Sequence, residues 1–258
     1  MATTKKTAVV PAEAQNTALA MPADFSQFAG MGMEEADKSS FAIPFVTMLQ
    51  GLSPQLETVE GARPGLFINT ITNELFKAVR VVPCAFQRRF IRWAPRETGG
   101  GYRGDFSPID VETGKLAGAH QSDDGQWEIE GDRLSDTRNH YVMFEDAYGA
   151  WRPALISLSS TQIKKSKRWM SLIQGIQLRN PAGRLYTPPS FSHIYKLGAV
   201  KEKNAKGEWW GLDVTLDSPI TDVEVFNMAM AFHKSVAAGE VQVQEPVEDG
   251  AGEGNGGF

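Results

Sequence analysis

The sequence predicts a mainly β (α+β) fold, built from antiparallel hairpins with two flanking helices. Apolar residues alternate in short runs separated by turn residues, and two other segments repeat apolar residues at three and four positions. Strands never alternate with crossover helices, as a parallel sheet would need. With 258 residues, 41% of them hydrophobic, the chain can bury a core without disulfides or metals.

The N-terminal part should be a disordered arm followed by a segment that covers a sheet. Residues 1–23 are rich in Ala and Thr and carry few large apolar side chains. Burial therefore cannot offset the entropy cost of ordering them. The apolar content then rises up to the run Phe41–Leu49, in which Pro44 prevents an uninterrupted helix. We expect an extended segment and a short helix there.

Three hairpins should supply about six strands. The strand that ends the first hairpin is long, and we expect a bulge near Pro83 because proline cannot donate to a ladder. Turn residues connect the other two hairpins at Tyr148-Gly149 and Asn204–Gly207. The predicted strand pairs are 66–71 with 78–93, 141–144 with 154–158, and 191–200 with 208–216.

Residues 94–138 have a different composition from the predicted strands. They contain eight glycines, several aspartates and few aliphatic side chains. We expect a long, mobile loop or a weakly structured hairpin, and loops of this length are commonly functional or disordered.

The two helices have recognisable boundaries. Ser159–Gln162 has the spacing of a capping box, with a hydroxyl at the N-cap and Gln three residues later. The helix that follows should run to about Leu178 and end at Asn180–Gly183. Ser218-Pro219 should open a last helix, whose apolar residues recur at three and four positions.

This inventory fits an OB-fold-like antiparallel Greek-key barrel with a long loop insertion and two flanking helices. A split β-sandwich is the alternative. The expected organisation is a disordered N-terminal arm (1–23), an OB-like domain (24–238) and a flexible acidic C-terminal tail (239–258).

The net charge of −5 is unevenly distributed along the chain. Residues 41–234 hold 23 basic and 21 acidic side chains, whereas residues 235–258 hold five acidic side chains and no basic one. Within the basic body, residues 77–103 contain seven Lys or Arg against the single acid Glu97. The overall sign therefore does not argue against a nucleic-acid partner.

The segment 77–103 is the main candidate for binding single-stranded DNA. If 86–93 is a strand, Phe86, Arg88, Phe90 and Arg92 share one face, because side chains alternate. Aromatic rings stack on unpaired bases, and guanidinium groups bind phosphates. The alternative is that the rings are core residues and the arginines are only solvated. The candidate residues in this segment are Arg80, Phe86, Arg88, Arg89, Phe90, Arg92, Trp93, Arg96, Tyr102 and Arg103.

A second basic cluster lies in the first turns of the predicted helix at 163–178. Lys164 and Arg168 are four residues apart, so they share one face of that helix. An ordinary solvated helix face with Trp169 in the core explains this pattern equally well. The cluster consists of Lys164, Lys165, Lys167 and Arg168. If the Arg88, Phe90 and Arg92 face is buried, the DNA site would move to this helix or to the lysine-rich third hairpin.

The acidic tail is the second informative feature. A tail of opposite sign can occupy a basic groove until DNA displaces it, and a terminal aromatic residue can anchor a partner protein. A solubilising tail with no further role is the alternative. The tail residues concerned are Glu245, Glu248, Asp249, Glu253 and Phe258.

The aromatic-basic segment on an OB-type body, with an acidic tail that ends in Phe258, resembles bacteriophage and bacterial single-stranded-DNA-binding proteins. The segments Phe41–Gln50, Ile91–Arg96 and Leu158–Gln162 are similar to stretches of phage replication proteins. The resemblance implies a protein that protects single-stranded DNA during phage replication or recombination and recruits a polymerase, helicase or nuclease through its tail. The tail departs from the bacterial type, because Gly-Asn-Gly-Gly-Phe258 stands where a dense acidic tip is expected.

Other function classes find little support. The four histidines are far apart, the single cysteine, Cys84, reads as a buried thiol, and no P-loop, dinucleotide fingerprint or nucleophile elbow occurs. We therefore expect no catalytic residues, cofactor or metal. Lacking a signal peptide or a run of about 18 apolar residues, the chain is expected in the cytoplasm, that of the host if it is viral. A homodimer, a Mg²⁺-dependent nuclease using the Asp-rich loop, and a strand-annealing or virion-associated structural protein remain alternatives.

Overall fold

The computed structural model describes residues 25–36, 40–95, 97, 99–205, 207–241 and 243. The chain divides into two compact units, Met1–Ala36 and Asp37–Phe258. The described part of the first unit contains a short 3-10 helix, η1 (Ser26–Phe28), with no buried residue. The elements below all belong to the second unit. The predicted arm at 1–23 and most of the predicted tail lie outside the described residues.

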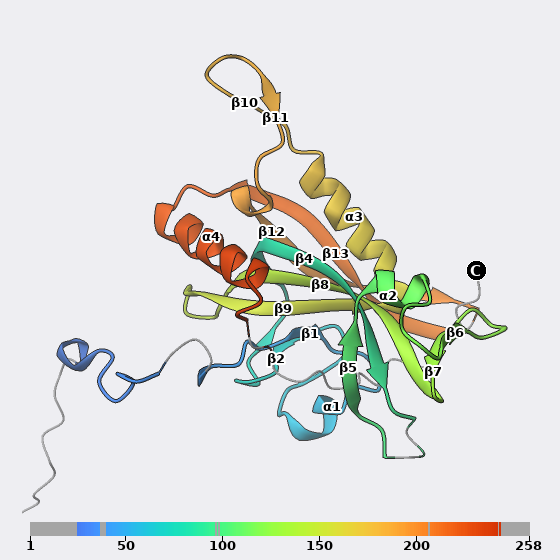
Figure 1. Cartoon of the computed structure of the whole chain (residues 1–258). Helices are drawn as coiled ribbons and strands as arrows, with labels where there is room; N and C mark the ends of the chain where they lie inside the picture. Colours follow the sequence, from blue (N-terminus) through green and yellow to red (C-terminus); the bar gives the residue numbers. More distant parts are fainter. Residues whose placement is uncertain are drawn as a thin grey trace, which may run out of the picture. The chain divides into compact units, whose positions relative to one another are not determined.

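The second unit is mainly β, as predicted. Its eight-stranded sheet curls into a half-barrel in which β13, β12, β4, β8, β7 and β6 lie in this order, with β5 also paired to β4 and β9 to β8 (Figure 1). All of these pairs are antiparallel. The strands are β4 (Val79–Trp93), β5 (Tyr102–Phe106), β6 (Ala119–Gln121), β7 (Trp127–Ile129), β8 (Asp132–Glu145), β9 (Trp151–Ser159), β12 (His193–Asn204) and β13 (Gly207–Pro219).

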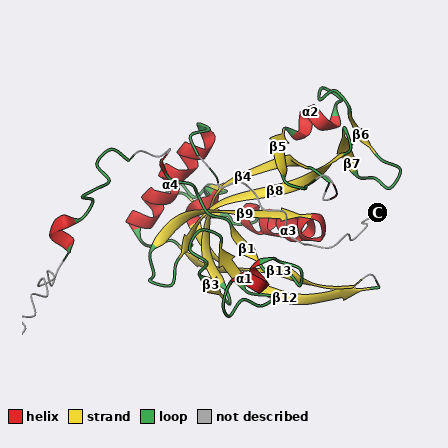
Figure 2. Ribbon diagram, turned by 90° about the horizontal axis from the view of Figure 1, so that it is seen from below, coloured by secondary structure: helices red, strands yellow, loops and turns green. Residues whose placement is uncertain are grey.

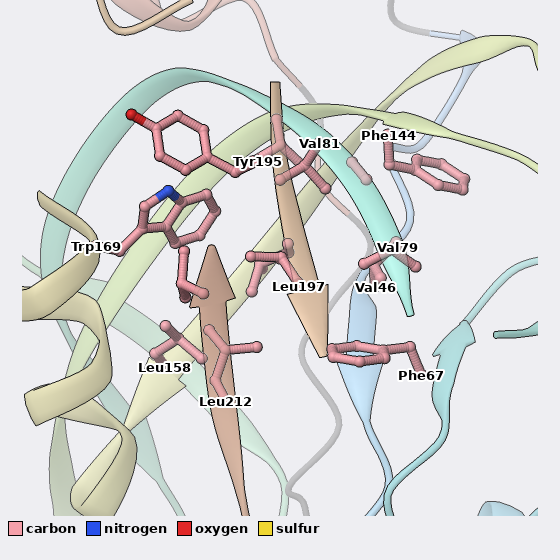
Figure 3. Close-up of a cluster of buried hydrophobic side chains, with 14 of the residues drawn as sticks. Val46, Phe67, Val79, Val81, Phe144, Leu158, Trp169, Tyr195, Leu197 and Leu212 are labelled. Atoms are coloured by element: carbon pink, nitrogen blue, oxygen red, sulfur yellow. The ribbon is translucent and has the colours of Figure 1, made fainter. Parts of the chain in front are cut away.

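The main core fills one face of this sheet. Val81, Phe144 and Leu197 point into it from β4, β8 and β12 (Figure 3). A small antiparallel sheet and the helix α3 (Ile163–Gln174) cover it, the latter through Trp169. The small sheet consists of β1 (Val46–Met48), β2 (Phe67–Asn69) and β3 (Leu75–Phe76), with the short helix α1 (Gln55–Thr58) between β1 and β2. The extended segment expected at Phe41–Leu49 contains β1, whereas the short helix lies after this run, at Gln55–Thr58.

The other face of the sheet carries a second core under α4 (Val223–Ala237). Val225, Ala229 and Phe232 of α4 pack in one cluster with Cys84 of β4. The thiol is buried, as predicted, and burial raises its pKa to about 12. The helix begins at Asp222, whose carboxylate accepts a hydrogen bond from the Glu224 backbone N–H at 2.8 Å. The predicted start at Ser218-Pro219 was wrong, because these residues end β13.

The hairpins at 141–158 and 191–216 form as predicted, and the first is longer than expected. The register of β4 against β8 shifts between Pro83 and Ala85, which confirms the predicted bulge. The first hairpin differs from the prediction. Strand β2 pairs with β1 and β3 in the small sheet, while β4 belongs to the large one.

Of the two structures expected for 94–138, the long mobile loop was wrong, and the short hairpin of β6 and β7 is closer to the alternative. This segment forms β5, α2 (Pro108–Glu112), β6, β7 and the first half of β8, around a small core of Phe90, Val111, Ile129 and Leu134. We call residues 102–138, together with residues 88–93 of β4, the distal part (Figure 2). Short strands with few aliphatic residues give little periodicity of their own. Here they are held by pairing to the long strands β4 and β8.

The chain between α3 and β12 also departs from the prediction. Helix α3 ends at Gln174 rather than near Leu178. Asn180–Gly183 is the turn of a two-stranded hairpin, and Gly183 takes the positive φ of +76° that such a turn requires. This hairpin consists of β10 (Leu178–Arg179) and β11 (Leu185–Tyr186), and a short 3-10 helix, η5 (Ser190–Ser192), leads from it into β12.

At the outer edge of β13, backbone groups form hydrogen bonds with the side-chain amides of two glutamines rather than with another strand. Gln50 accepts a hydrogen bond from the Trp210 N–H at 2.9 Å and donates to its carbonyl at 3.0 Å. Gln162, in the 3-10 turn η4 (Ser160–Gln162) before α3, donates to the same carbonyl at 2.7 Å and accepts from the Leu212 N–H at 3.0 Å. The predicted capping box was therefore wrong. The side chain of Gln162 binds a distant strand, and no side chain caps α3.

Replacement of Gln162 by Ala is expected to lower the free energy of unfolding by about 1–2 kcal/mol. The loss arises because the Leu212 N–H is left without its partner at a partly buried position. Urea denaturation measures this effect. Gln174→Ala at the exposed end of α3 is the matched control and should change stability by less than about 0.5 kcal/mol. Equal stabilities of the two variants would contradict this role of Gln162.

Candidate nucleic-acid interface

The predicted DNA-binding segment lies mainly on the distal half of β4. As the alternation predicts, Arg88 and Phe90 share a face, and the guanidinium carbon lies 5.3 Å from the centre of the ring. That face also carries Phe86, whose ring centre lies 5.1 Å from that of His140 across the strand pair. Strand geometry therefore places these residues as expected.

The burial of the aromatic rings differs from what stacking on bases requires. Phe90 is 1% exposed in the distal core, and Trp93 is 7% exposed. Tyr102 is partly buried and packs edge-on against Trp93, with ring centres 6.2 Å apart. Phe90 and Trp93 are therefore core residues in this structure, because α2 and β5 cover them. Phe86 remains more accessible, at 37% exposure.

The arginines of this segment are paired with carboxylates. Arg88 makes a two-pronged contact with Asp136, from Nε at 2.9 Å and Nη2 at 2.8 Å, and its Nη2 also lies 2.6 Å from Glu112. The remaining pairs are Arg80 with Glu145 and Asp217, Arg89 with Asp105, Arg92 with Glu130 and Asp132, and Arg103 with Asp132.

This pairing changes what the basic segment can do. Counted along the sequence, it has a surplus of six positive charges, but the fold brings seven carboxylates from other segments onto five of its arginines. A phosphate would have to replace a carboxylate that already makes charge-assisted hydrogen bonds. The Arg88, Phe90 and Arg92 face is thus covered or neutralised. By the criterion stated above, the candidate site moves to α3 or to the third hairpin. The pair of Lys201 with Glu208 on that hairpin favours α3.

Helix α3 is anchored through its inner side. Trp169 is fully buried and stacks on His140, with ring centres 4.4 Å apart at an interplanar angle of 15°. Ser166 Oγ lies 2.8 Å from His140 Nε2, also in the core. Burial, together with the charge of Arg138, lowers the pKa of His140 to about 3, so this imidazole is neutral at pH 7. These contacts fix which side of the helix faces outward.

The outer side of α3 carries the second predicted cluster. Lys164, Lys167 and Arg168 are exposed, whereas Lys165 is partly buried in an ion pair with Glu202 of β12. Arg168 lies 3.3 Å from Asp213, with both side chains at least half exposed, so this pair is weak. Within the described part of the chain, neither Lys164 nor Lys167 has an ion-pair partner. The structure therefore separates the four predicted residues into one structural lysine and three accessible cations.

A sequence signal that the sequence analysis did not use points to the same region. Residues 147–201 contain nine Lys or Arg and no Asp or Glu. This acid-free run covers β9, α3, the β10–β11 hairpin and most of β12. Carboxylates from outside the run pair with Arg152, Lys165, Arg168 and Lys201. The other five cations of the run have no ion-pair partner among the described residues. The run also includes Arg179, Arg184 and Lys196, which the candidate list omitted.

A pocket of about 330 Å³ lies beside Phe86. Its walls include Phe86 and His140 from the sheet, Met170 from α3 and His233 from α4. His233 Nδ1 lies 2.9 Å from the Cys84 carbonyl oxygen, which holds that ring against the bulge of β4. Helix α3 therefore forms one wall of this pocket, through Met170 and Ile173.

Several predicted site residues cannot be placed. Arg96 and the tail residues Glu245, Glu248, Asp249, Glu253 and Phe258 lie outside the described residues. The Asp-rich loop considered for a nuclease has Asp105 on Arg89 and Glu112 on Arg88. Across the described ranges, no group of three or more His, Cys, Asp or Glu side chains is arranged to hold a metal ion. No helix in the described parts has the length and hydropathy needed to cross a bilayer.

The model of the family described as Pam3 phage gp34-like protein matches residues 13–242, most of the chain. No curated protein and no solved structure matches.

Proposed function

The chain belongs to the Pam3 phage gp34-like protein family, and we propose that this bacteriophage protein binds single-stranded DNA during phage DNA replication or recombination. The proposed role is non-catalytic coating and protection of the strand. In this proposal the curled half-barrel acts as an OB-like body, and the acidic tail competes for the DNA surface and recruits replication proteins.

The accessible cations of α3 are the observation that carries the proposal. Lys164, Lys167 and Arg168 lie three and four residues apart on a helix whose other side is fixed by Trp169. No acidic residue occurs in the sequence within the helix or the hairpin that follows it. Phosphates compete well for cations without a strong partner, and each contact releases counterions from the DNA.

Binding to fluorescent oligothymidylate, measured by anisotropy over a range of salt concentrations, tests the proposal. The logarithm of the binding constant should fall linearly with the logarithm of the salt concentration. Replacing Lys164, Lys167 and Arg168 together by Gln should weaken binding at every salt concentration. It should also reduce the slope by about 2, because each lost phosphate contact on single strands removes about 0.7.

A matched triple variant controls for net charge. Arg63, Lys77 and Lys115 are exposed and lie outside α3. Replacing all three by Gln should leave affinity and slope close to wild type. Absence of wild-type binding at low salt would overturn the proposed function. Equal slopes for the two triple variants would instead remove α3 from the interface.

The two rival functions give different results with the same preparation. A coat protein leaves labelled single and double strands intact in Mg²⁺, whereas a nuclease cuts them. A strand-annealing or virion-associated protein would form large rings or filaments on a sizing column. A coat protein of this kind should elute as a monomer or dimer.

A further inference from the structure

The hairpin β10–β11 forms a sheet of its own. Leu178 pairs with Tyr186 and Arg179 with Leu185, and neither strand joins the main sheet. Figure 1 shows the hairpin beyond the C-terminal end of α3, projecting from the body. Its turn is well defined: the Gly183 N–H donates to the Asn180 carbonyl at 2.8 Å, and Asn180 Oδ1 accepts from the Arg184 N–H at 2.9 Å. The hairpin is thus an ordered projection.

This projection exposes large apolar side chains. Leu178 is 38% exposed, Leu185 58% and Tyr186 43%, although each lies on a paired strand. None of the three belongs to the buried clusters described above. Exposed apolar groups on so small an element contribute little to folding and are typical of contact surfaces.

The charges on the hairpin indicate the chemistry of its partner. Arg179 and Arg184 are both exposed, and no Asp or Glu occurs anywhere between residues 147 and 201. Arg179 donates from Nη1 to the Gly183 carbonyl at 2.9 Å. Among the described residues, neither arginine has an ion-pair partner. Two cations beside apolar and aromatic side chains favour a partner that carries both negative charges and planar rings.

The register places a cation beside an apolar group on each face. Leu178 and Tyr186 are directly opposite, so they share a face. Arg184 directly precedes β11, and its carbonyl accepts from the Asn180 N–H at 2.9 Å, so the pairing continues to it and alternation places it on the face of Tyr186. Arg179 and Leu185 share the other face. A base stacked on Tyr186 would therefore have its phosphate within reach of Arg184.

We propose that this hairpin is a second single-stranded-DNA contact, in which Tyr186 stacks on an unpaired base and Arg179 and Arg184 bind the flanking phosphates. The proposal rests on the proposed function and extends the interface from α3 along the acid-free run. A second copy of the chain suits the hairpin less well. A symmetric contact between two hairpins would bring four guanidinium groups together without a carboxylate.

Two probes of equal length separate stacking from phosphate binding: oligothymidylate, and an abasic deoxyribose-phosphate oligomer. Tyr186→Ala should weaken binding to oligothymidylate about tenfold and leave binding to the abasic strand unchanged. Tyr186→Phe should bind both probes like wild type, because the ring is kept. Tyr148→Ala, at a side chain that is 91% exposed in the β8–β9 turn, is the matched control and should change neither.

The arginines have a separate signature. Replacing Arg179 and Arg184 by Gln should reduce the salt slope by about 1.4 on both probes, since two phosphate contacts are lost. Replacing the exposed Arg63 and Lys115 by Gln is the control with the same change in charge. Melting temperatures should equal that of wild type, because the hairpin lies outside the cores.

The outcomes distinguish this inference from the proposed function. If wild type binds and the α3 triple variant weakens binding, but Tyr186→Ala keeps wild-type affinity for both probes, the hairpin inference alone fails. A Tyr186→Ala variant that changes oligomeric state but not affinity would also overturn it, in favour of an interface between copies. Wild type that binds neither probe at low salt would overturn both.

Discussion

Replacement of Trp169 by Ala is expected to lower the free energy of unfolding by about 3–5 kcal/mol. The side chain is fully buried in the main core, where it stacks on His140 with ring centres 4.4 Å apart. It also lies edge-on to Tyr195, with ring centres 6.1 Å apart (Figure 3). It is also the largest of the fully buried side chains. Its removal leaves a cavity beneath α3 that the surrounding sheet cannot fill.

Trp169→Phe separates packing from the loss of the indole N–H. Nε1 of Trp169 is buried and has no hydrogen-bond partner among the described residues. The Phe variant therefore removes an unpaired donor while keeping an aromatic ring, and about 1–2 kcal/mol of loss is expected.

Urea denaturation followed by circular dichroism measures these losses, with Tyr148→Ala as the control at an exposed aromatic residue. That control should stay within about 0.5 kcal/mol of wild type. A Trp169→Ala variant within 1 kcal/mol of wild type would show that α3 is not anchored as described. The inner side of the helix would then no longer fix the outward direction of Lys164 and Lys167.

Replacement of Asp132 by Ala is expected to destabilise the distal part by about 2–3 kcal/mol. Its side chain is 2% exposed and accepts hydrogen bonds from Arg92 and Arg103, the latter at 3.1 Å to both oxygens. Removing it leaves Arg92, itself 17% exposed, with Glu130 as its one ion-pair partner among the described residues. The loss is smaller than for a wholly buried pair, because the Arg103 side chain is 48% exposed.

The same carboxylate predicts a pH dependence. Burial alone would raise the pKa of Asp132, but the hydrogen bonds and charges of Arg92 and Arg103 outweigh it, so the pKa lies below its ordinary 3.8. A carboxylate with a depressed pKa stabilises the fold at pH values above its unfolded pKa. That contribution is lost as the pH falls through the folded pKa. Asp132→Asn lacks the stabilisation that the ionised carboxylate provides. The difference between its free energy of unfolding and that of wild type should therefore shrink as the pH falls from about 4 to about 2.

Hydrogen exchange localises the effect. Amides of β5, β7 and the first half of β8 should exchange faster in Asp132→Ala, while those of β12 and β13 should stay protected. Asp105→Ala is the matched control, because its pair with Arg89 lies on the surface of the same part, with side chains 35% and 38% exposed. It should cost less than about 1 kcal/mol. Equal losses for the two variants would contradict the role assigned to Asp132.

Much of the fold could be predicted from local sequence. The hairpins at 141–158 and 191–216, the bulge near Pro83, the buried Cys84 and the existence of α3 and α4 follow from alternation, proline chemistry and helical periodicity. The distal part could not be predicted in this way. Its short strands β6 and β7 have three residues each, too few to show a period, and they owe their order to pairing with β8.

The candidate site was also predictable only as far as local sequence patterns reach. The α3 cations were identified from their spacing, but so were the arginines of β4, and sequence spacing does not distinguish the two sets. The hairpin residues Arg179, Arg184 and Tyr186 were overlooked, although the absence of acids from 147 to 201 was visible in the sequence.

The sequence by itself determined which residues alternate, which side chains share a face and where positive charge accumulates, because these depend on neighbours a few positions apart. Only the tertiary structure decided which of those charges remain accessible. Asp136 meets Arg88, and Asp217 meets Arg80, across 48 and 137 residues of chain. Lys164 and Lys167 meet no carboxylate among the described residues. Ion pairing depends on distance in space, and chain folding sets that distance.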